Sequence, residues 1–480
     1  MTTIPTAPFT AHELTTHQRH RAIGALIGAA SGDALGGPFE FLPAGLYDEV
    51  FPTRVIGGCG EMVGGGSFGW EPAEFTDDTQ MALALAESLI EDHSFDPQRT
   101  WKHFVAWSLK ATDIGNTTST ALSNSNYSTA AQLAHERLGQ SGSNGSVMRI
   151  APIGIFGVTI GADRTVALAR EQSALTHFDE TAGWGAAIVA ELIRRLIISG
   201  DLNDSLNHLL HFVPEPHKAI YEELISVEWN PMLPGFPGNG SARICIAQAL
   251  WSVRTTTSFE DAITTAINLG DDADTVAAVT GAIGGALYGI QQIPARWTTY
   301  LHGYVNQPDG VLREYTVGDL QDIAHRLLGS KSKQETPLED VISPTSVHDA
   351  GIYASNMTGA HEMNPEAGIV SLCRTYGRLT EHPHRREYYI IDNDGQNSHL
   401  HTLVTDAVDA IDAFLREGRE VLVHCHGGRS RTGFVLKAWY MRNVDPSHDA
   451  AHEWLTDTWP DYATWSADFW VFLEEEWMQD

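Results

Sequence analysis

The chain has 480 residues, of which 42% are hydrophobic and 19% are charged, and its formal net charge is −31. This composition predicts a packed globular chain of two or three domains and excludes intrinsic disorder. The excess of acid excludes a broad basic surface for nucleic acid or for an anionic membrane, although local groups can still bind small anionic ligands.

Targeting signals and zinc motifs are missing from the sequence. No apolar run reaches the roughly 18 residues needed to span a bilayer, and the first 20 residues lack the pattern of a secretory signal. The four cysteines lie far apart, without a CxxC pair, which argues against a thiolate zinc site. We therefore expect a cytoplasmic protein with no membrane partner.

The first part of the chain, residues 18–330, is predicted to be an all-α domain. Ala-rich stretches such as 80–90 and 183–196 place apolar residues at the helical period, and alternating β-branched runs are scarce. Residues 331–344 are polar and contain proline, which is typical of an interdomain linker.

The pattern changes in residues 345–480. Short apolar runs at 368–373, 388–391 and 420–424 indicate buried strands, and the segment 403–415 indicates a helix between them. Strands that alternate with helices predict an α/β domain with a parallel sheet.

Two acidic clusters, at residues 75–80 and 270–275, each come directly before a predicted helix. Acids there can simply cap the helix and complement its dipole. Two such clusters also repel each other, and a divalent cation relieves that repulsion. The all-oxygen ligand set favours Mg or Mn over Zn. Glycines in the second helix would allow close packing on a neighbouring helix; they are Gly281, Gly284, Gly285 and Gly289.

Four motifs in this order carry a family resemblance: IGALIGAASGDALGGPFE at 23–40, FTDDTQMAL at 75–83, NGSVMRIAP at 144–152 and GDDADT at 270–275. Together they resemble the ADP-ribosylglycohydrolases, which include the dinitrogenase reductase-activating glycohydrolases. The resemblance implies an all-α fold, two divalent metal ions (Mg or Mn) and hydrolysis of the bond between C1″ of ADP-ribose and a modified acceptor.

The resemblance also assigns roles to individual residues. It implies metal ligands at Thr76, Asp77, Asp78, Asp272, Asp274 and Thr275. Glu40 matches a glutamate that guards the metal site, and a carboxylate there can serve as base. The substrate-binding positions implied are Ser141, Asn144 and Gly145 in the loop that lines the distal ribose, His177 near the ligand, and Asp113 facing a guanidinium in arginine-directed members. His177 could instead be an ordinary core or surface histidine, and Asp113 only a helix cap.

Two positions depart from the family pattern. Ser143 stands where a glycine is common before Asn144, and Ala73 stands where a glycine is common before Glu74. The first departure touches the ribose loop and affects substrate preference; neither removes a ligand.

A second candidate catalytic motif lies after the linker, in the segment VLVHCHGGRSRTG at 421–433. Cys425 and Arg431 are six positions apart between a predicted strand and a predicted helix, so the loop between them forms a cradle of backbone N–H groups for an anion. Arg431 can grip phosphate oxygens in a bidentate fashion, and the same positive field favours the reactive thiolate of Cys425. Thr432 can donate a hydrogen bond to that thiolate as it leaves.

This segment resembles the cysteine-dependent phosphatases, particularly the dual-specificity class. In that family an aspartate about thirty residues before the cysteine protonates the leaving oxygen, and here Asp392 and Asp394 are both candidates. The alignment of the following helix favours Asp394, 31 residues before Cys425, although Asp394 could also be only a turn residue before Gly395.

The leading hypothesis is a bifunctional hydrolase: a metal-dependent ADP-ribosyl hydrolase joined to a cysteine-based phosphatase acting on a phosphoprotein or a small phosphate ester. Three alternatives remain open. The second domain could be a phosphate-binding module; both sites could process one ADP-ribose phosphate; or the chain could be an inactive interaction protein, against which the full set of acids argues.

Overall fold

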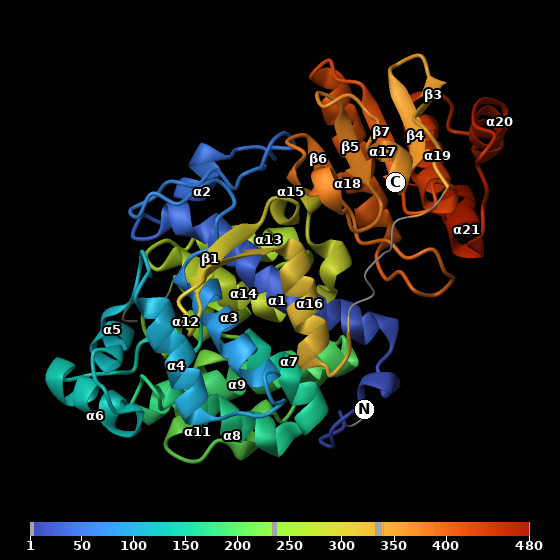
Figure 1. The fold of residues 1–480 in the computed structure, drawn as a ribbon. Coiled ribbons are helices and arrows are strands. Elements are labelled where there is room, and N and C mark those ends of the chain that lie inside the picture. The colour runs from blue at the N-terminus through green and yellow to red at the C-terminus, as the bar shows by residue number, and fades with distance from the viewer. Residues whose placement is uncertain (1–3, 233–237, 332–337, 339, 480) are drawn as a thin grey trace. The chain divides into compact units, whose positions relative to one another are not determined.

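The computed structural model describes residues 4–232, 238–331, 338 and 340–479, so residues 332–337 and 339 of the predicted linker lie outside it. The chain folds into two units. Unit 1 comprises Met1–Thr53, Glu61–Ile293 and Tyr300–Ser332, and unit 2 comprises Arg54–Gly60, Pro294–Thr299 and Lys333–Asp480 (Figure 1). Among the described residues, no helix is both long enough and apolar enough to cross a bilayer.

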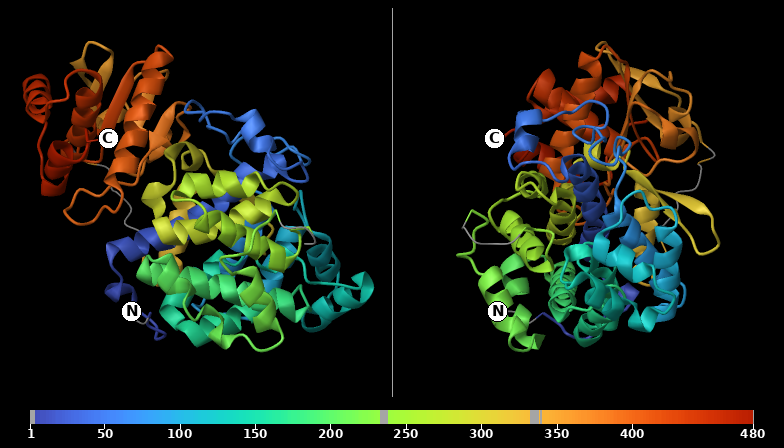
Figure 2. Two further views of the ribbon diagram at one scale, coloured as in Figure 1. Left: turned by 180° about the vertical axis from the view of Figure 1, so that it is seen from behind. Right: turned by 90° about the vertical axis from the view of Figure 1, so that its left-hand side faces the viewer.

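Unit 1 is helical, as predicted, and its helices surround the pair α1 and α14 (Figures 1 and 2). Its helices are α1 (Thr16–Gly36), α2 (Leu46–Val50), α3 (Asp77–Ile90), α4 (Pro97–Ser108), α5 (Asn116–Leu122), α6 (Tyr127–Leu138), α7 (Ala151–Ile160), α8 (Ala162–Ser173), α9 (Glu180–Ser199), α10 (Leu202–Leu206), α11 (His217–Leu224), α12 (Ala242–Arg254), α13 (Phe259–Ile267), α14 (Ala273–Tyr288) and α16 (Val317–Leu327). A two-stranded antiparallel ribbon, β1 (His302–Asn306) and β2 (Leu312–Thr316), is added to them.

Glycines bring α1 and α14 into direct backbone contact. A Cβ at Gly28 would collide with the carbonyl of Gly281, and a Cβ at Gly285 would collide with the carbonyl of Gly24. The close packing predicted for Gly281 and Gly285 is therefore confirmed. The two helices run antiparallel, so the C-terminal end of α1 lies beside the first turn of α14, where the second acidic cluster begins.

Unit 2 is an α/β domain, as predicted, with a five-stranded sheet in the order β3-β4-β7-β5-β6. Its strands are β3 (Thr345–His348), β4 (Ile352–Asn356), β5 (Gly368–Ser371), β6 (Arg385–Glu387) and β7 (Val421–Cys425). Its helices are α15 (Ala295–Thr298), α17 (Met357–Ala360), α18 (Leu400–Arg416), α19 (Ser430–Asn443), α20 (His448–Thr458) and α21 (Ala467–Glu475). Only β3 runs antiparallel to its neighbour; the other pairs are parallel.

Alternate side chains of the central strands enter two separate cores, as the period of two in a strand requires. Val421 and Val423 of β7 pack with α18, α19, α20 and α21 on one face. Leu422 packs with α17 on the other face. The sheet is thus covered on both faces, which explains why its parallel strands are continuously apolar.

One predicted strand is misplaced. The strand that pairs with β5 at this point is β6, Arg385–Glu387, whereas the predicted strand 388–391 follows it and lies outside every described strand. The apolar pattern of this segment has another cause: Tyr388 and Ile390 are buried in the core beside α18. Burial without strand pairing produces the same apolar run, so the sequence pattern could not separate the two cases.

Candidate active sites

Asp33, at the C-terminal end of α1, fixes the start of α3. Its buried carboxylate accepts hydrogen bonds from the backbone N–H groups of Thr76 (3.0 Å) and Thr79 (2.9 Å). These donors belong to the first turn of a helix, where the intrahelical partners are missing. Burial raises the pKa of Asp33 to about 6 despite these bonds. Asp33 therefore holds the first acidic cluster against α1. It is not among the site residues that the sequence predicted.

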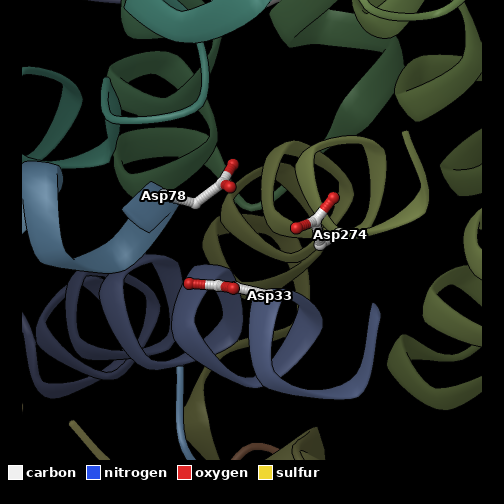
Figure 3. A group of neighbouring side chains, drawn as sticks. All are labelled: Asp33, Asp78 and Asp274. Atoms are coloured by element: carbon white, nitrogen blue, oxygen red, sulfur yellow. The ribbon is translucent and has the colours of Figure 1, made fainter. Parts of the chain in front are cut away.

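Carboxylates from α1, α3 and α14 converge at this point (Figure 3). Oxygens of Asp33, Asp78 and Asp274 all lie within 4.8 Å of one another, and oxygens of Glu40, Asp272 and Asp274 form a second such group. Asp274 belongs to both groups, so it lies between them. The two acidic clusters, nearly 200 residues apart in sequence, are thereby joined with Glu40 into one site.

Threonine hydroxyls complete this arrangement. The Oγ1 atoms of Thr76 and Thr275 lie 3.4 Å and 3.5 Å from the Oδ2 atom of Asp78. Five of the predicted ligand positions are now placed around the two carboxylate groups. The sixth, Asp77, is buried in the first turn of α3 and feels the charges of Glu40 and Asp272.

The electrostatics of the site are those of buried carboxylates that lie close to one another. Burial, followed by the neighbouring carboxylates, raises the pKa values of Asp77, Asp78 and Asp274 well above their usual range. Burial likewise raises the pKa of Glu40 to about 8, with Asp113 and Asp272 adding to the effect. Buried charges are stable only when they are paired or bind a cation.

Unsatisfied oxygens show that this site fits a metal. Glu40 Oε2 and Asp78 Oδ1 are buried and accept no hydrogen bond among the described residues. Buried acceptors of this kind are rare in folded proteins and call for a partner such as an ion. The donors are carboxylate and hydroxyl oxygens, which suit Mg or Mn rather than Zn.

The predicted ribose loop is placed beside Asp272. The Nδ2 atom of Asn144 donates to Asp272 Oδ2 at 2.7 Å and to the carbonyl of Asn239 at 3.1 Å. Ser141 is buried, and its hydroxyl contacts His135 and the backbone N–H of Asp179, so in this arrangement it braces the start of α9.

His177 is held in the protein interior by two hydroxyls. Its Nδ1 atom lies 2.8 Å from Thr176 Oγ1, and its Nε2 atom lies 2.9 Å from Ser143 Oγ. Burial lowers the pKa of His177 to about 3, so the imidazole is neutral. A Cβ at Gly145 would press on this ring at 3.2 Å. Ser143, the departure from the family pattern, therefore contacts the histidine that packs against the predicted ribose loop.

Asp113 lies at the edge of this site. Its carboxyl is partly buried, and burial and the charge of Asp272 raise its pKa, while a hydrogen bond from the backbone of Ile114 opposes the change. It is not a member of either group of converging oxygens. This position is compatible with contact to a substrate rather than to a metal.

Asn239 fixes the second acidic cluster, and sequence reasoning missed it. Its Oδ1 atom accepts the backbone N–H of Asp272 at 3.0 Å, and its Nδ2 atom donates to the carbonyl of Gly270 at 3.0 Å. The only sequence signal was its place in a glycine-rich loop shortly before α12. An amide that bonds the carbonyl of Gly270 and the N–H of Asp272 fixes the backbone that carries the Asp272 carboxylate, without being a ligand.

We expect Asn239→Ala to weaken binding of Mg or Mn by about 10–100-fold, the range typical of groups that orient metal ligands. Isothermal titration calorimetry on the full chain measures this directly. Asn268→Ala is the matched control, because its side chain accepts the N–H of Asp48 and, among the described residues, makes no hydrogen bond to the acidic clusters. Equal metal affinity in the two variants would contradict the role given to Asn239.

In unit 2, the Cys425–Arg431 motif forms a strand, loop and helix, as predicted. Cys425 is the buried last residue of β7, and α19 begins at Ser430. Gly428 has φ of 62°, and a Cβ there would collide with the backbone of Asn356, so only glycine fits. The hydroxyl of Thr432 is buried without a hydrogen-bond partner among the described residues, which leaves it available to Cys425 or a ligand.

Neighbouring groups hold this loop in place. Arg431 Nη1 donates to the carbonyls of Leu372 (3.0 Å) and Ile390 (3.2 Å). The ring of His424 contacts Ser371 Oγ at 2.7 Å, and burial lowers its pKa to about 3, so it is neutral and structural. The two candidate aspartates diverge: Asp392 contacts Ser430 of the loop, whereas Asp394 contacts Ser466.

Comparison with known proteins identifies a family for each of the two domains. A family model described as ADP-ribosylglycohydrolase matches residues 14–337, and one described as dual specificity phosphatase, catalytic domain, matches residues 362–473. The chain belongs to the ADP-ribosylglycohydrolase family. It combines this hydrolase domain with a dual specificity phosphatase domain, as the sequence motifs predicted.

Several similar proteins match the first domain. The "ADP-ribosylarginine hydrolase Tri1" of Serratia proteamaculans is 34% identical over 291 residues, which cover 58% of this chain and 74% of the relative. The "ADP-ribosyl-[dinitrogen reductase] glycohydrolase" of Rhodospirillum rubrum is 27% identical over 289 residues, covering 58% and 90%. A solved structure, "ADP-ribosylglycohydrolase-related protein complex", has a TM-score of 0.50 and 28% identity, covering 66% of this chain and 99% of that one.

Proposed function

We propose that the chain is a bifunctional hydrolase in which unit 1 removes ADP-ribose from a modified acceptor with the help of two Mg or Mn ions. The observation that carries this proposal is the convergence of Asp33, Asp78 and Asp274 with Glu40 and Asp272, including buried oxygens without hydrogen bonds. The ligands would be Thr76, Asp77, Asp78, Asp272, Asp274 and Thr275. When bound, the ions would polarise the ribose hydroxyls and activate water.

Other residues of unit 1 would orient the ligands, shape the ribose loop and accept a proton. Asn144 orients Asp272, and neutral His177 packs against Gly145 to shape the ribose loop. Glu40 is the candidate base that accepts a proton from water, because its Oε2 atom accepts no hydrogen bond from the described residues and its carboxylate lies beside those of Asp272 and Asp274. Carboxylates around C1″ stabilise the oxocarbenium-like centre that forms as the acceptor leaves.

ADP-ribosylated arginine is the acceptor that we propose first. The relative from Serratia proteamaculans is named for this substrate. Asp113 offers an anionic group at the edge of the site, and a carboxylate pairs well with a guanidinium.

The second activity that we propose is hydrolysis of a phosphate ester by Cys425. The observation that carries it is the strand–loop–helix placement of Cys425 and Arg431, with the backbone N–H groups at the start of α19 available to the phosphate. The substrate is a phosphoprotein or a small phosphate ester. An aspartate from the segment 392–394 would protonate the leaving oxygen.

A cross-inhibition experiment on the full chain tests both activities together. We expect EDTA to abolish release of ADP-ribose from an ADP-ribosylated arginine peptide and to leave turnover of p-nitrophenyl phosphate unchanged; orthovanadate should have the opposite selectivity. A serine-linked peptide tests the acceptor. Release of ADP-ribose that survives EDTA would refute the metal site, and no turnover of any phosphate ester would leave unit 2 as a binding module.

A further inference from the structure

The segment that follows β6 touches the Cys425–Arg431 motif at two points. Arg431 donates to the carbonyl of Ile390 at 3.2 Å, and the hydroxyl of Ser430 donates to Asp392 Oδ1 at 2.7 Å. Ser430 and Arg431 are the last two residues of the motif that binds the phosphate in our proposal. The carboxylate of Asp392 is therefore in direct contact with the phosphate-binding loop.

The backbone directly before Asp392 is fixed by a side chain from further along the turn. Asn397 folds back so that its Oδ1 atom accepts the N–H of Ile391 at 3.0 Å, and its Nδ2 atom donates to the carbonyl of the same residue at 2.8 Å. This pair of bonds closes the turn from 391 to 397. Asp392, next to the anchored residue, is thus held toward the loop, and it is partly buried.

Asp394 is held in a different direction. Its Oδ1 atom accepts the hydroxyl of Ser466 at 2.7 Å and the backbone N–H of Asp468 at 3.3 Å, at the N-terminal end of α21. These two bonds lower its pKa, and the side chain is exposed. An exposed carboxylate that caps a helix stays ionised at neutral pH and is a poor proton donor.

We infer that Asp392, and not Asp394, is the proton donor of the phosphatase reaction in unit 2. The inference rests on the proposed phosphatase function and names the acid within the same site. It differs from the assignment by sequence spacing, which favoured Asp394.

The proposed step balances as follows. The thiolate of Cys425 attacks phosphorus and forms an S–P bond, while the P–O bond to the leaving group breaks and Asp392 gives its proton to the leaving oxygen. The resulting Asp392 carboxylate then takes a proton from water, which attacks phosphorus. The S–P bond breaks, inorganic phosphate leaves, and both Cys425 thiolate and protonated Asp392 are restored.

Two leaving groups distinguish proton donation from a merely structural role. We expect Asp392→Asn to lower kcat for phenyl phosphate by about 10²-fold or more, the range of general acid catalysis. For p-nitrophenyl phosphate, whose leaving group needs no proton, the loss should be much smaller.

Asp394→Asn is the matched variant, two residues away. Asparagine keeps a side-chain oxygen that can accept the bonds from Ser466 and Asp468, so the ratio of the two rates should stay as in the wild type. An equal loss for both substrates in Asp392→Asn, or a selective loss in Asp394→Asn, would overturn the assignment. Absence of turnover of both esters by the wild type would instead overturn the phosphatase function, and this assignment with it.

Discussion

Substitution of Cys425 by serine is expected to reduce turnover of p-nitrophenyl phosphate by on the order of 10⁴-fold or more, the scale seen when an enzyme loses its nucleophile. Cys425 is the last residue of β7 and directly precedes the phosphate-binding loop. A serine hydroxyl is far less ionised than a thiol, so the attacking anion is lost while the loop remains. Initial rates at saturating substrate measure the effect.

Two controls separate this loss from unfolding. Cys373→Ser changes another buried cysteine of unit 2, one that packs in the core on the α17 face of the sheet, and its turnover should stay within a few-fold of the wild type. Release of ADP-ribose by Cys425→Ser should match the wild type, because unit 1 has its own core. Residual phosphatase activity above one per cent in Cys425→Ser would show that Cys425 is not the nucleophile.

Much of this site geometry was predictable because it depends on local sequence. The segment 421–433 contains the strand, the loop and the helix that place Cys425 six residues from Arg431. The acidic clusters likewise sit in the first turns of α3 and α14, where the sequence placed them. Glycines of α14 predicted close helix packing because a residue without a Cβ lets a neighbouring backbone approach closely.

The contributions of Asp33 and Asn239 could not be predicted in the same way. Asp33 contacts N–H groups more than 40 residues away, and Asn239 contacts the backbone of Asp272. Such contacts depend on which loops the fold brings together, and a lone acid or amide in a sequence carries no sign of its partner. The choice between Asp392 and Asp394 could not be made from the sequence for the same reason, since both fit the spacing and only the turn closed by Asn397 separates their directions.

The acidic site of unit 1 should also control the stability of the protein. The pKa of Asp33 rises from 3.8 to about 6 on folding, and that of Glu40 from 4.5 to about 8. At a pH between the unfolded and the folded pKa of each group, the folded chain binds more protons than the unfolded chain. The free energy of unfolding therefore falls as pH rises. These two groups are therefore expected to make the metal-free protein lose stability progressively from about pH 4 to about pH 8.

Mg or Mn should reverse this loss, because cation binding displaces the same protons and gains affinity as pH rises. At a metal concentration about 100 times Kd, the stabilisation is about 2.7 kcal/mol, or roughly 5 °C in the unfolding temperature of a domain of this size. The increase measured by calorimetry should be larger at pH 8 than at pH 5.5. An equal increase at both values would show that the cation does not bind at these carboxylates.

Asp78→Asn provides the sharpest form of this test, since its two expected effects have opposite signs. Removing one carboxylate relieves repulsion with Asp33 and Asp274, so the metal-free variant should unfold at a higher temperature than the wild type at pH 8. The same change should abolish the metal-induced increase and lower ADP-ribose release by at least about 10²-fold. Asp271→Asn is the control, because Asp271 is exposed beside the second cluster and has φ of 59°, a conformation that asparagine accepts. This variant should retain both the metal-induced increase in unfolding temperature and the release of ADP-ribose. A metal response that persists in Asp78→Asn would place the cation elsewhere.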